Sequence, residues 1–470
     1  MSLTTLVTTF ALLVTAYFAI WNASQIVMGA AASMFLWRYR RRRTRRNRAL
    51  AGRLASPPLV SVVVPAHNEA LTIVESVRAL LALEYEAREI VIINDGSADD
   101  TLEVLRKTFH LLPAPLAFVQ PLKTAPVRGV YRSIDEPALV VIDKENGGCK
   151  ADAVNAGFNA ASGVLVLVID ADTVLEPDAL SRAALPFLED STTIAVGAYV
   201  AIANGCRIEH GSITEVALPR SWLARFQIVE YMRSFLLFRL ACASRNGVTL
   251  ISGAFGLFRR DAAIDVGGYD PTAIGEDMDL TIRLQMFYRS RRQPSRIAFV
   301  PLPMCWTQAP EDLASLRSQR CRWRRGLLQA LWRHRRAIGN PRYGIVGIGV
   351  LPYTTIVEGF GPLLEVSGYV VTTVAALLGV LNWSHYRVLL AVSVLFGAAA
   401  TMLAVLLSDV ATRRYNRGRD LALLVTVAIL ENIGYRQLNS WWGCVGTVQA
   451  LRGKGGWGPM RRRAFEGRAA

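Results

Sequence analysis

The sequence has few cysteines and histidines, and none of them forms a recognisable metal-binding pattern. Six cysteines and five histidines occur in 470 residues, without a C-x-x-C pair or a Cys/His cluster. Scattered thiols of this kind are typical of a reducing compartment and argue against structural zinc. Internal repeats and low-complexity tracts are also lacking. The cysteines are Cys149, Cys206, Cys242, Cys305, Cys321 and Cys444.

Acidic residues are in deficit, with 37 Asp and Glu against 53 Lys and Arg, which gives a formal net charge of +16. Much of the excess lies in four runs, at 38–48, 317–336, 413–419 and 461–463. A basic chain can bind nucleic acid. These runs flank apolar stretches, however, which is typical of the cytosolic side of a membrane protein in contact with anionic lipid. We therefore expect membrane lipid, and no nucleic acid, among the partners.

Long apolar stretches predict membrane segments. The composition is 52% hydrophobic and the mean hydropathy is +0.28, which is too apolar for an ordinary soluble domain. Residues 5–37 are almost wholly apolar and long enough for a tilted span. An arginine-rich run follows at once, so the positive-inside rule predicts an external N-terminus and a cytosolic location for the residues after 38.

Three more apolar stretches lie at about 343–382, 386–409 and 420–451. The first is long for one pass, and we expect Gly359–Pro362 to break it. The last contains ionisable residues such as Glu431, and two topologies stay open for it. It either crosses and leaves a basic tail outside, or re-enters and keeps the tail cytosolic, which the basic tail favours.

The residues between the apolar blocks alternate short β-branched runs with helical patterns. This alternation predicts a doubly wound α/β sheet, in which ligands bind beyond the carboxyl ends of the strands. Continuous apolar runs predict buried parallel strands at 59–65, 89–93, 139–142 and 163–169, with helices at 69–83 and 99–109.

Polar residues follow these strands. Asp170 and Asp172 come after the fourth, and two carboxylates facing one spot suit Mg²⁺ or Mn²⁺, with a diphosphate supplying further oxygens. Asp95 lies in a tight turn after the second strand, where it could bond a nucleotide base or ribose. Lys150 opens a helix after a glycine turn, which favours an anion. Each residue also fits a plain structural role as a solvated turn or helix cap.

Two further groups lie nearer the C-terminus. Glu276 and Asp277 precede a helical run, and adjacent carboxylates raise one another's pKa, which suits a general base for an acceptor hydroxyl. Gln319, Arg322 and Trp323 share one face of a basic amphipathic helix. An Arg there could neutralise a leaving diphosphate, and a Trp could stack on a sugar. The alternatives are acids that complement a helix dipole and an interfacial Trp/Arg anchor.

In this order the motifs resemble those of the family 2 glycosyltransferases. They resemble most closely the processive membrane branch, which includes cellulose, hyaluronan, chitin and poly-N-acetylglucosamine synthases. The resemblance covers about residues 55–340. It rests on VVVPAHNE (62–69), NDGS (94–97), GGCKA (147–151), DAD (170–172), ISGAFG (251–256), GED (275–277) and QRCRW (319–323).

The resemblance implies roles for individual residues. Asp277 becomes the catalytic base, with Glu276 beside it. The residues implied at the donor are Ala66, Glu69, Asp95, Lys150, Asp170, Asp172 and Arg322. Of these, Asp172 and Asp170 are also implied as ligands of Mg²⁺ or Mn²⁺. The residues implied at the acceptor are Ser252, Gly253, Gln319 and Trp323.

The fold class implied is α/β, a GT-A (nucleotide-diphospho-sugar transferase) domain inserted between N- and C-terminal transmembrane helices. The 311–342 segment is expected to be an amphipathic helix lying in the membrane surface. The expected boundaries are 1–37 for the N-terminal transmembrane helix, 38–54 for a basic linker, 55–310 for the cytosolic GT-A domain, 311–342 for the interface helix, 343–452 for the C-terminal transmembrane region and 453–470 for a basic tail.

The activity implied is inverting transfer from a UDP-sugar, UDP-GlcNAc favoured, to a growing β-linked polysaccharide that is extruded through the plasma (inner) membrane. Small membrane or export subunits are further candidate partners. Two alternatives stay open: transfer of one sugar to a lipid-linked acceptor, and a catalytically silent scaffold or sugar-binding subunit. The tail motif WGPMRR (457–462) is similar to tryptophan-containing gating loops of some family members, which predicts a role for Trp457.

Overall fold

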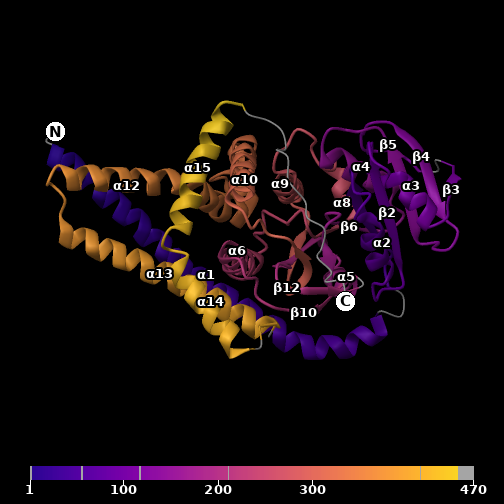
Figure 1. The fold of residues 1–470 in the computed structure, drawn as a ribbon, viewed down its shortest axis with the longest axis horizontal. Coiled ribbons are helices and arrows are strands. Elements are labelled where there is room, and N and C mark those ends of the chain that lie inside the picture. Colours follow the sequence, from indigo (N-terminus) through magenta and orange to yellow (C-terminus); the bar gives the residue numbers. More distant parts are fainter. Residues whose placement is uncertain are drawn as a thin grey trace.

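The computed structural model describes residues 3–53, 57–115, 118–209, 211–412, 414–415 and 417–453. A mixed α/β domain forms one end of the molecule, and long apolar helices form the other, with the N-terminus at the far tip of the helical end (Figure 1). The tail motif around Trp457 lies outside the described residues.

The domain is built on a ten-stranded sheet in the order β3-β4-β5-β2-β1-β6-β11-β8-β12-β7. Its centre is parallel. Strand β1 (Val60–Ala66) pairs with β2 (Arg88–Asp95) and β6 (Leu165–Val168), and β2 also pairs with β5 (Leu139–Lys144). These are the four strands that the apolar runs predict.

The two flanks of the sheet are not doubly wound. Strands β3 and β4 are antiparallel beyond β5, and β11 runs antiparallel to both β6 and β8. Strand β12 is parallel to β8, and β7 closes the edge antiparallel. The α/β class is therefore confirmed, with a mixed sheet. These strands and a separate hairpin are β3 (Leu111–Ala114), β4 (Val127–Ser133), β7 (Val174–Leu175), β8 (Thr193–Ile202), β9 (Arg207–Glu209), β10 (Ser212–Glu215), β11 (Gly256–Arg259) and β12 (Arg296–Thr307).

Both faces of β1 are buried, which explains its uninterrupted apolar sequence. Val62 and Val64 pack in the core that contains α2 (Ile73–Leu81), and Val63 packs on the opposite face with α4 (Lys150–Ala160). The other domain helices are α3 (Thr101–Thr108), α5 (Ala179–Glu189), α6 (Trp222–Met232), the π-helical η1 (Arg233–Arg239), α7 (Leu240–Ala243), α8 (Arg260–Asp265), α9 (Glu276–Ser290) and α10 (Leu313–Arg333), followed by the turns η2 (Arg335–Ala337) and η3 (Pro341–Tyr343).

The sequence predicts that helix α10 lies in the membrane surface. In the structure this helix has neighbours within the chain. It packs against α15 (Tyr435–Leu451) and beside α9 (Figure 1). Arg320, Arg324 and Arg325 are buried, whereas Arg317 is exposed, so only part of the basic positions of this helix turn inward. Buried charge is costly unless it is paired, and these arginines therefore need partners in the domain and in the apolar helices.

Three helices of the described chain are long and apolar enough to cross a membrane: Leu12–Arg41, Val346–Leu377 and Tyr386–Thr412. The first belongs to α1 (Leu3–Arg53), which stays helical through the segment predicted as a linker. The predicted break at Gly359–Pro362 is instead a change of helix type within one continuous helical segment. The segments involved are η4 (Val346–Val350), α11 (Leu351–Tyr353), η5 (Thr354–Phe360), α12 (Gly361–Leu377) and, after it, α13 (Trp383–Thr412).

The last apolar stretch forms two helices, α14 (Gly418–Leu430) and α15, which are bent by 53° at the break between them. The loop before α14 lies on the domain, because Arg414 Nη2 is 2.7 Å from Glu176 Oε2. Near its other end, α15 receives a hydrogen bond of 2.9 Å from Arg324 Nε of α10 at Thr447 Oγ1. Both ends of the α14–α15 pair thus lie against the domain.

Candidate active site

A cavity of about 1000 Å³ opens beyond the carboxyl ends of β1, β2 and β6. All thirteen residues that the sequence places at the donor, the catalytic pair and the acceptor line it. The structure therefore brings together Ala66, Glu69, Asp95, Lys150, Asp170, Asp172, Ser252, Gly253, Glu276, Asp277, Gln319, Arg322 and Trp323.

Asp95 ends β2 and is held on one side by a buried lysine. Its Oδ1 accepts hydrogen bonds from Lys144 Nζ at 2.6 Å and from the Gly147 main-chain N–H at 3.1 Å. The Lys144 side chain is 0% exposed and also lies 2.5 Å from Asp152 Oδ2. Two carboxylates around one ammonium satisfy a charge that would otherwise be costly to bury. Lys144 ends β5, and its place before the glycine turn is the only signal of this role in the amino-acid sequence.

Glu69 and Ala66 form the wall next to Asp95. Both are buried. The Glu69 main-chain N–H donates to Thr101 Oγ1 at 2.9 Å, and its carboxylate accepts from Thr72 Oγ1 at 2.9 Å, so Glu69 ties the start of α2 to that of α3. Its carboxylate has a structural partner in addition to its place on the cavity wall.

Lys150 links the donor side of the cavity to the catalytic side. Its ammonium pairs with Asp170 Oδ1 and donates to the Gly253 carbonyl at 3.0 Å. The Gly253 N–H in turn donates to Asp277 Oδ2 at 3.2 Å. A side chain at Gly253 would stand 3.4 Å from Lys150 Nζ and 3.8 Å from Asp277 Oδ2, so glycine keeps this space open.

Asp170 and Asp172 lie in the turn after β6 rather than on the strand itself. Burial, followed by the charge of Asp170, raises the pKa of Asp172 to about 6. A cation beside the two carboxylates would relieve this repulsion. Within the described chain, no group of three or more His, Cys, Asp or Glu side chains stands ready to hold a metal, so other ligands would have to complete its shell.

Glu276 and Asp277 occupy the first turn of α9, where the helix dipole favours negative charge. Burial opposes that preference. It is the largest cause of the raised pKa of both groups, and the neighbouring charge of Asp277 adds to it at Glu276, whose pKa rises to about 7. The charges of Lys150 and Arg239 act in the opposite direction on Asp277. Burial and the charge of Asp277 therefore favour the protonated form of Glu276 up to about neutral pH.

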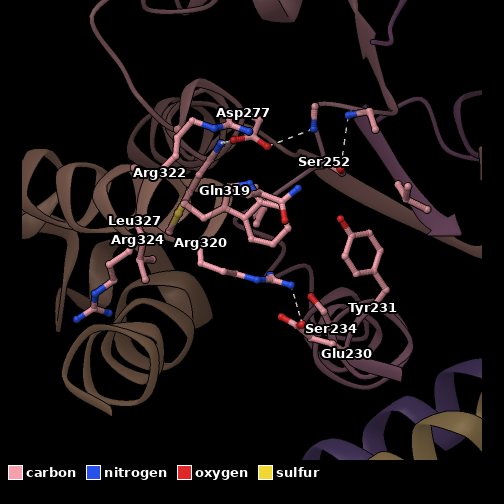
Figure 2. A pocket seen from close by; sticks show the side chains of 18 of the residues that line it. Glu230, Tyr231, Ser234, Ser252, Asp277, Gln319, Arg320, Arg322, Arg324 and Leu327 are labelled. Carbon is pink, nitrogen blue, oxygen red and sulfur yellow. Dashed lines mark hydrogen bonds and ion pairs between the residues drawn. The ribbon is translucent and has the colours of Figure 1, made fainter. Parts of the chain in front are cut away.

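The side chains of α10 close the cavity opposite the sheet. In Figure 2, Asp277, Ser252, Gln319 and Tyr231 surround one open space. Gln319 Oε1 is buried and has no hydrogen-bond partner among the described residues. The ring centroids of Trp323 and Tyr231 lie 6.4 Å apart, which forms an aromatic wall suited to a sugar face.

Arg320, inside the same motif, is a site residue that sequence reasoning missed. It is buried, and its Nη2 donates to Glu230 Oε2 at 2.8 Å and to the Tyr435 hydroxyl at 3.3 Å. Its guanidinium also lies 4.6 Å from the centroid of the Trp323 ring. Arg320 therefore fixes α10 between α6 and α15 and supports the tryptophan. Nothing in its spacing distinguishes it from the other arginines of the helix.

The cavity continues past Asp277 between the apolar helices. Its lining there includes Tyr17 and Trp21 of α1, Glu358 and Glu365 of the Val346–Leu377 segment, and Arg436 of α15. Arg436 Nε donates to Glu365 Oε1 at 3.0 Å, and its guanidinium lies 4.7 Å from the Trp21 ring centroid. Polar groups at this depth are typical of a hydrophilic path through a membrane protein.

The sequence profile described as "Glycosyl transferase family 2" matches residues 61–267, and that described as "Glycosyl transferase family group 2" matches residues 165–430. The second match covers more than half of the chain. This chain belongs to the family 2 glycosyltransferases. The resemblance seen in the motifs is thereby confirmed, and the glycosyltransferase is an enzyme whose family uses nucleotide-sugar donors.

Curated relatives of this glycosyltransferase include poly-beta-1,6-N-acetyl-D-glucosamine synthases. The one from Staphylococcus aureus (strain COL) is 30% identical over 274 residues, which are 58% of this chain and 56% of the relative. The synthase from Staphylococcus epidermidis is 29% identical over 280 residues, and the match likewise covers 58% of this chain and 56% of the relative. The matched region thus spans little more than half the length of these relatives.

Among solved structures, the glycosyltransferase is similar to a mannosyltransferase from Pyrobaculum calidifontis in complex with GDP-Man and Mn²⁺. The match has a TM-score of 0.49 and 18% identity, and it covers 94% of this chain and 100% of that one.

Proposed function

We propose that this glycosyltransferase transfers N-acetylhexosamine from a UDP-sugar to the end of a growing β-linked polysaccharide and passes the product into the membrane. The observation that carries the proposal is the continuity of the cavity. One space is lined by Asp95 at the donor end, by Asp277 in the middle and by Glu365 between the apolar helices. The extension is lined by the ion pair of Glu365 and Arg436, which suits a hydrophilic polysaccharide better than the apolar tail of a lipid carrier. The relatives' activity as poly-N-acetylglucosamine synthases supports N-acetylglucosamine as the sugar.

The reaction proposed is a single in-line displacement. Asp277 takes the proton of the acceptor hydroxyl, the freed oxygen attacks the anomeric carbon, and the bond from that carbon to the diphosphate breaks with inversion. Arg322, which lines the cavity, would stabilise the negative charge of the departing UDP. Ser252 and Gly253 would hold the acceptor end, with Gln319 and Trp323 opposite.

Asp172 and Asp170 fit a divalent cation, since burial and then the charge of Asp170 raise the pKa of Asp172, and a cation would offset both effects. Mg²⁺ or Mn²⁺ held there would supply positive charge to the diphosphate, whose oxygens would complete the ligand shell. Lys150 already neutralises part of Asp170, which favours Asp172 as the main ligand.

A multi-pass location in the plasma membrane with a cytosolic domain is part of the proposal. Arg417 Nη2 lies 3.2 Å from Glu215 Oε1, so the basic loop before α14 stands beside the domain. Basic loops face the cytosol. Because α15 also packs on α10 of the domain, we propose that α14 and α15 form a re-entrant pair that keeps both of its ends cytosolic.

The test is UDP release by the purified protein in detergent with Mn²⁺, across UDP-GlcNAc, UDP-Glc, UDP-GlcA and UDP-Gal, together with sizing of the product. We expect release with UDP-GlcNAc and a long product. The Asp277→Asn variant should lose about 10²-fold or more of the rate while it still binds UDP. Its matched control is Asp135→Asn, at an exposed position of the domain.

Each other outcome has a distinct meaning. A product one sugar longer than the acceptor would show single transfer to a lipid-linked or soluble acceptor. Release of UDP with only one of the other three donors would show that the sugar of that donor, rather than N-acetylglucosamine, is transferred. An absence of release with all four donors, from folded protein that binds none of them, would favour a silent scaffold or sugar-binding subunit.

A further inference from the structure

Arg239 is a partly buried arginine whose guanidinium has no hydrogen-bonding partner among the described residues. It is the last residue of η1 and lines the cavity. Its Nη1 is buried and makes no hydrogen bond within the described chain. Its guanidinium stacks over the Phe235 ring, 3.9 Å from the centroid, which fixes its direction. Burial lowers the pKa of Arg239 to about 10, and the nearby charges of Asp277 and Glu358 oppose this shift.

Glu358 carries the complementary feature. It lies in η5 within the Val346–Leu377 segment and lines the same cavity. Arg324 donates to the Glu358 and Gly359 main-chain carbonyls. The Glu358 carboxylate makes no hydrogen bond, nor an ion pair within 4 Å, with any described residue. Glu358 is exposed to the cavity. A charged side chain that faces a cavity between apolar helices is typical of a polar path that holds a ligand.

The backbone supports the same interpretation. Both residues lie on π-helical segments, η1 and η5. Such segments are rare and occur often at functional sites, because the wider turn redirects a side chain. Two π-helical segments that present unpaired charges to one cavity are therefore unlike ordinary helix packing.

We infer that Arg239 and Glu358 form an acceptor subsite on the membrane side of Asp277, which binds one neutral sugar residue of the chain being extended. The guanidinium would donate to a hydroxyl or acetamido oxygen. The carboxylate would accept from a hydroxyl or an acetamido N–H. A sugar that offers both donors and acceptors satisfies the pair, whereas an anionic sugar would be repelled by Glu358. This inference rests on the proposed function.

The order of charges along the cavity separates this subsite from the donor. Asp170 pairs with Lys150, Lys150 reaches Asp277 through Gly253, and Asp277 is the strongest opposite charge acting on Arg239. Because η1 packs against α1 and α13, Arg239 lies on the side of Asp277 that faces the apolar helices. A ligand there is part of the acceptor rather than of the UDP-sugar.

The experiment measures initial UDP release against the concentration of β-linked N-acetylglucosamine oligosaccharides, at saturating UDP-GlcNAc. We expect Arg239→Gln and Glu358→Gln each to raise the KM for the oligosaccharide by about tenfold, the effect of losing one charged hydrogen bond. The KM for UDP-GlcNAc and the Kd for UDP should stay within about twofold. The matched control, Arg245→Gln, changes an exposed arginine on the turn after α7 and should leave both KM values unchanged.

Calorimetric binding of the oligosaccharide without any donor provides a second measurement, independent of turnover. Weaker binding to Arg239→Gln than to wild type, with UDP binding intact, supports the subsite. Equal binding by both, or a parallel rise in the donor and acceptor KM values, overturns it. Failure of the wild-type protein to release UDP would contradict the proposed function, and the calorimetric comparison would still decide whether this pair binds sugar.

Discussion

Gly326 on α10 lies in main-chain contact with Gly275, the residue before α9. A Cβ on Gly326 would stand 3.0 Å from Gly275 Cα, closer than ordinary packing allows. This contact presses the helix that carries Arg322 against the turn that precedes the proposed catalytic pair, Glu276 and Asp277. Two stretches some fifty residues apart in the sequence can therefore share one site only because neither has a side chain at the crossing.

Gly326→Val should displace α10 and abolish most activity, because overpacking at a helix crossing costs about 1–3 kcal/mol. UDP release and Tm in detergent would both fall. The control is Gly418→Ala, since a Cβ at Gly418 would meet no atom within 4 Å. Full activity in Gly326→Val would show that this close approach is not needed for catalysis.

Lys144→Met should weaken both folding and nucleotide binding. The substitution would leave the Asp95 and Asp152 carboxylates, 9% and 10% exposed, without their shared cation. Breaking a buried pair in this way costs about 3–5 kcal/mol. The Tm and the Kd for UDP measure the two effects, and the exposed Lys123→Met is the control. An unchanged Tm would contradict the assignment of Lys144 as the partner of these acids.

Glu276 should make stability depend on pH in a defined direction. Its pKa in the folded protein, about 7, lies above the ordinary value of 4.5, so the protonated form favours folding. This contribution is complete below about pH 4.5 and is lost as the pH rises through about 7. Glu276→Gln stays neutral, so its Tm relative to wild type should increase between pH 4.5 and 8. The control Glu136→Gln, at an exposed position, should show no such trend. A Tm difference between Glu276→Gln and wild type that decreases as the pH rises would contradict the prediction.

Arg436 and Glu365 should act as one unit between the apolar helices. Ser440 Oγ also donates to Glu365 Oε2 at 2.5 Å, so the carboxylate is fully engaged. Arg436→Met or Glu365→Met alone leaves a charge at membrane depth without its partner and should cost about 3–5 kcal/mol, whereas the double variant should regain most of that loss. Tm values of the wild type, the two single variants and the double variant, all measured in one detergent, complete this double-mutant cycle. Additive losses would mean that the two residues are independent.

The amino-acid sequence was sufficient to predict the central strands, because β1, β2, β5 and β6 are buried on both faces and each appears as a continuous apolar run. It also determined which residues meet in the cavity, because motifs that follow parallel strands converge at one edge of a sheet. The family followed from the order of those motifs.

Other features depended on the tertiary structure. The direction of strands β8, β11 and β12 is set by long-range contacts, since β11 runs antiparallel to β6 and β8 whereas β12 runs parallel to β8. Arg320 and Arg324 of α10 face inward because a carboxylate and main-chain carbonyls from distant helices meet them, which spacing along one helix cannot show. Lys144, Arg320 and Arg239 acquire their roles in the same way, since burial and partners are properties of the folded chain. Local sequence specifies the groups that do the chemistry, and packing specifies which buried charges are paired and which remain open to a ligand.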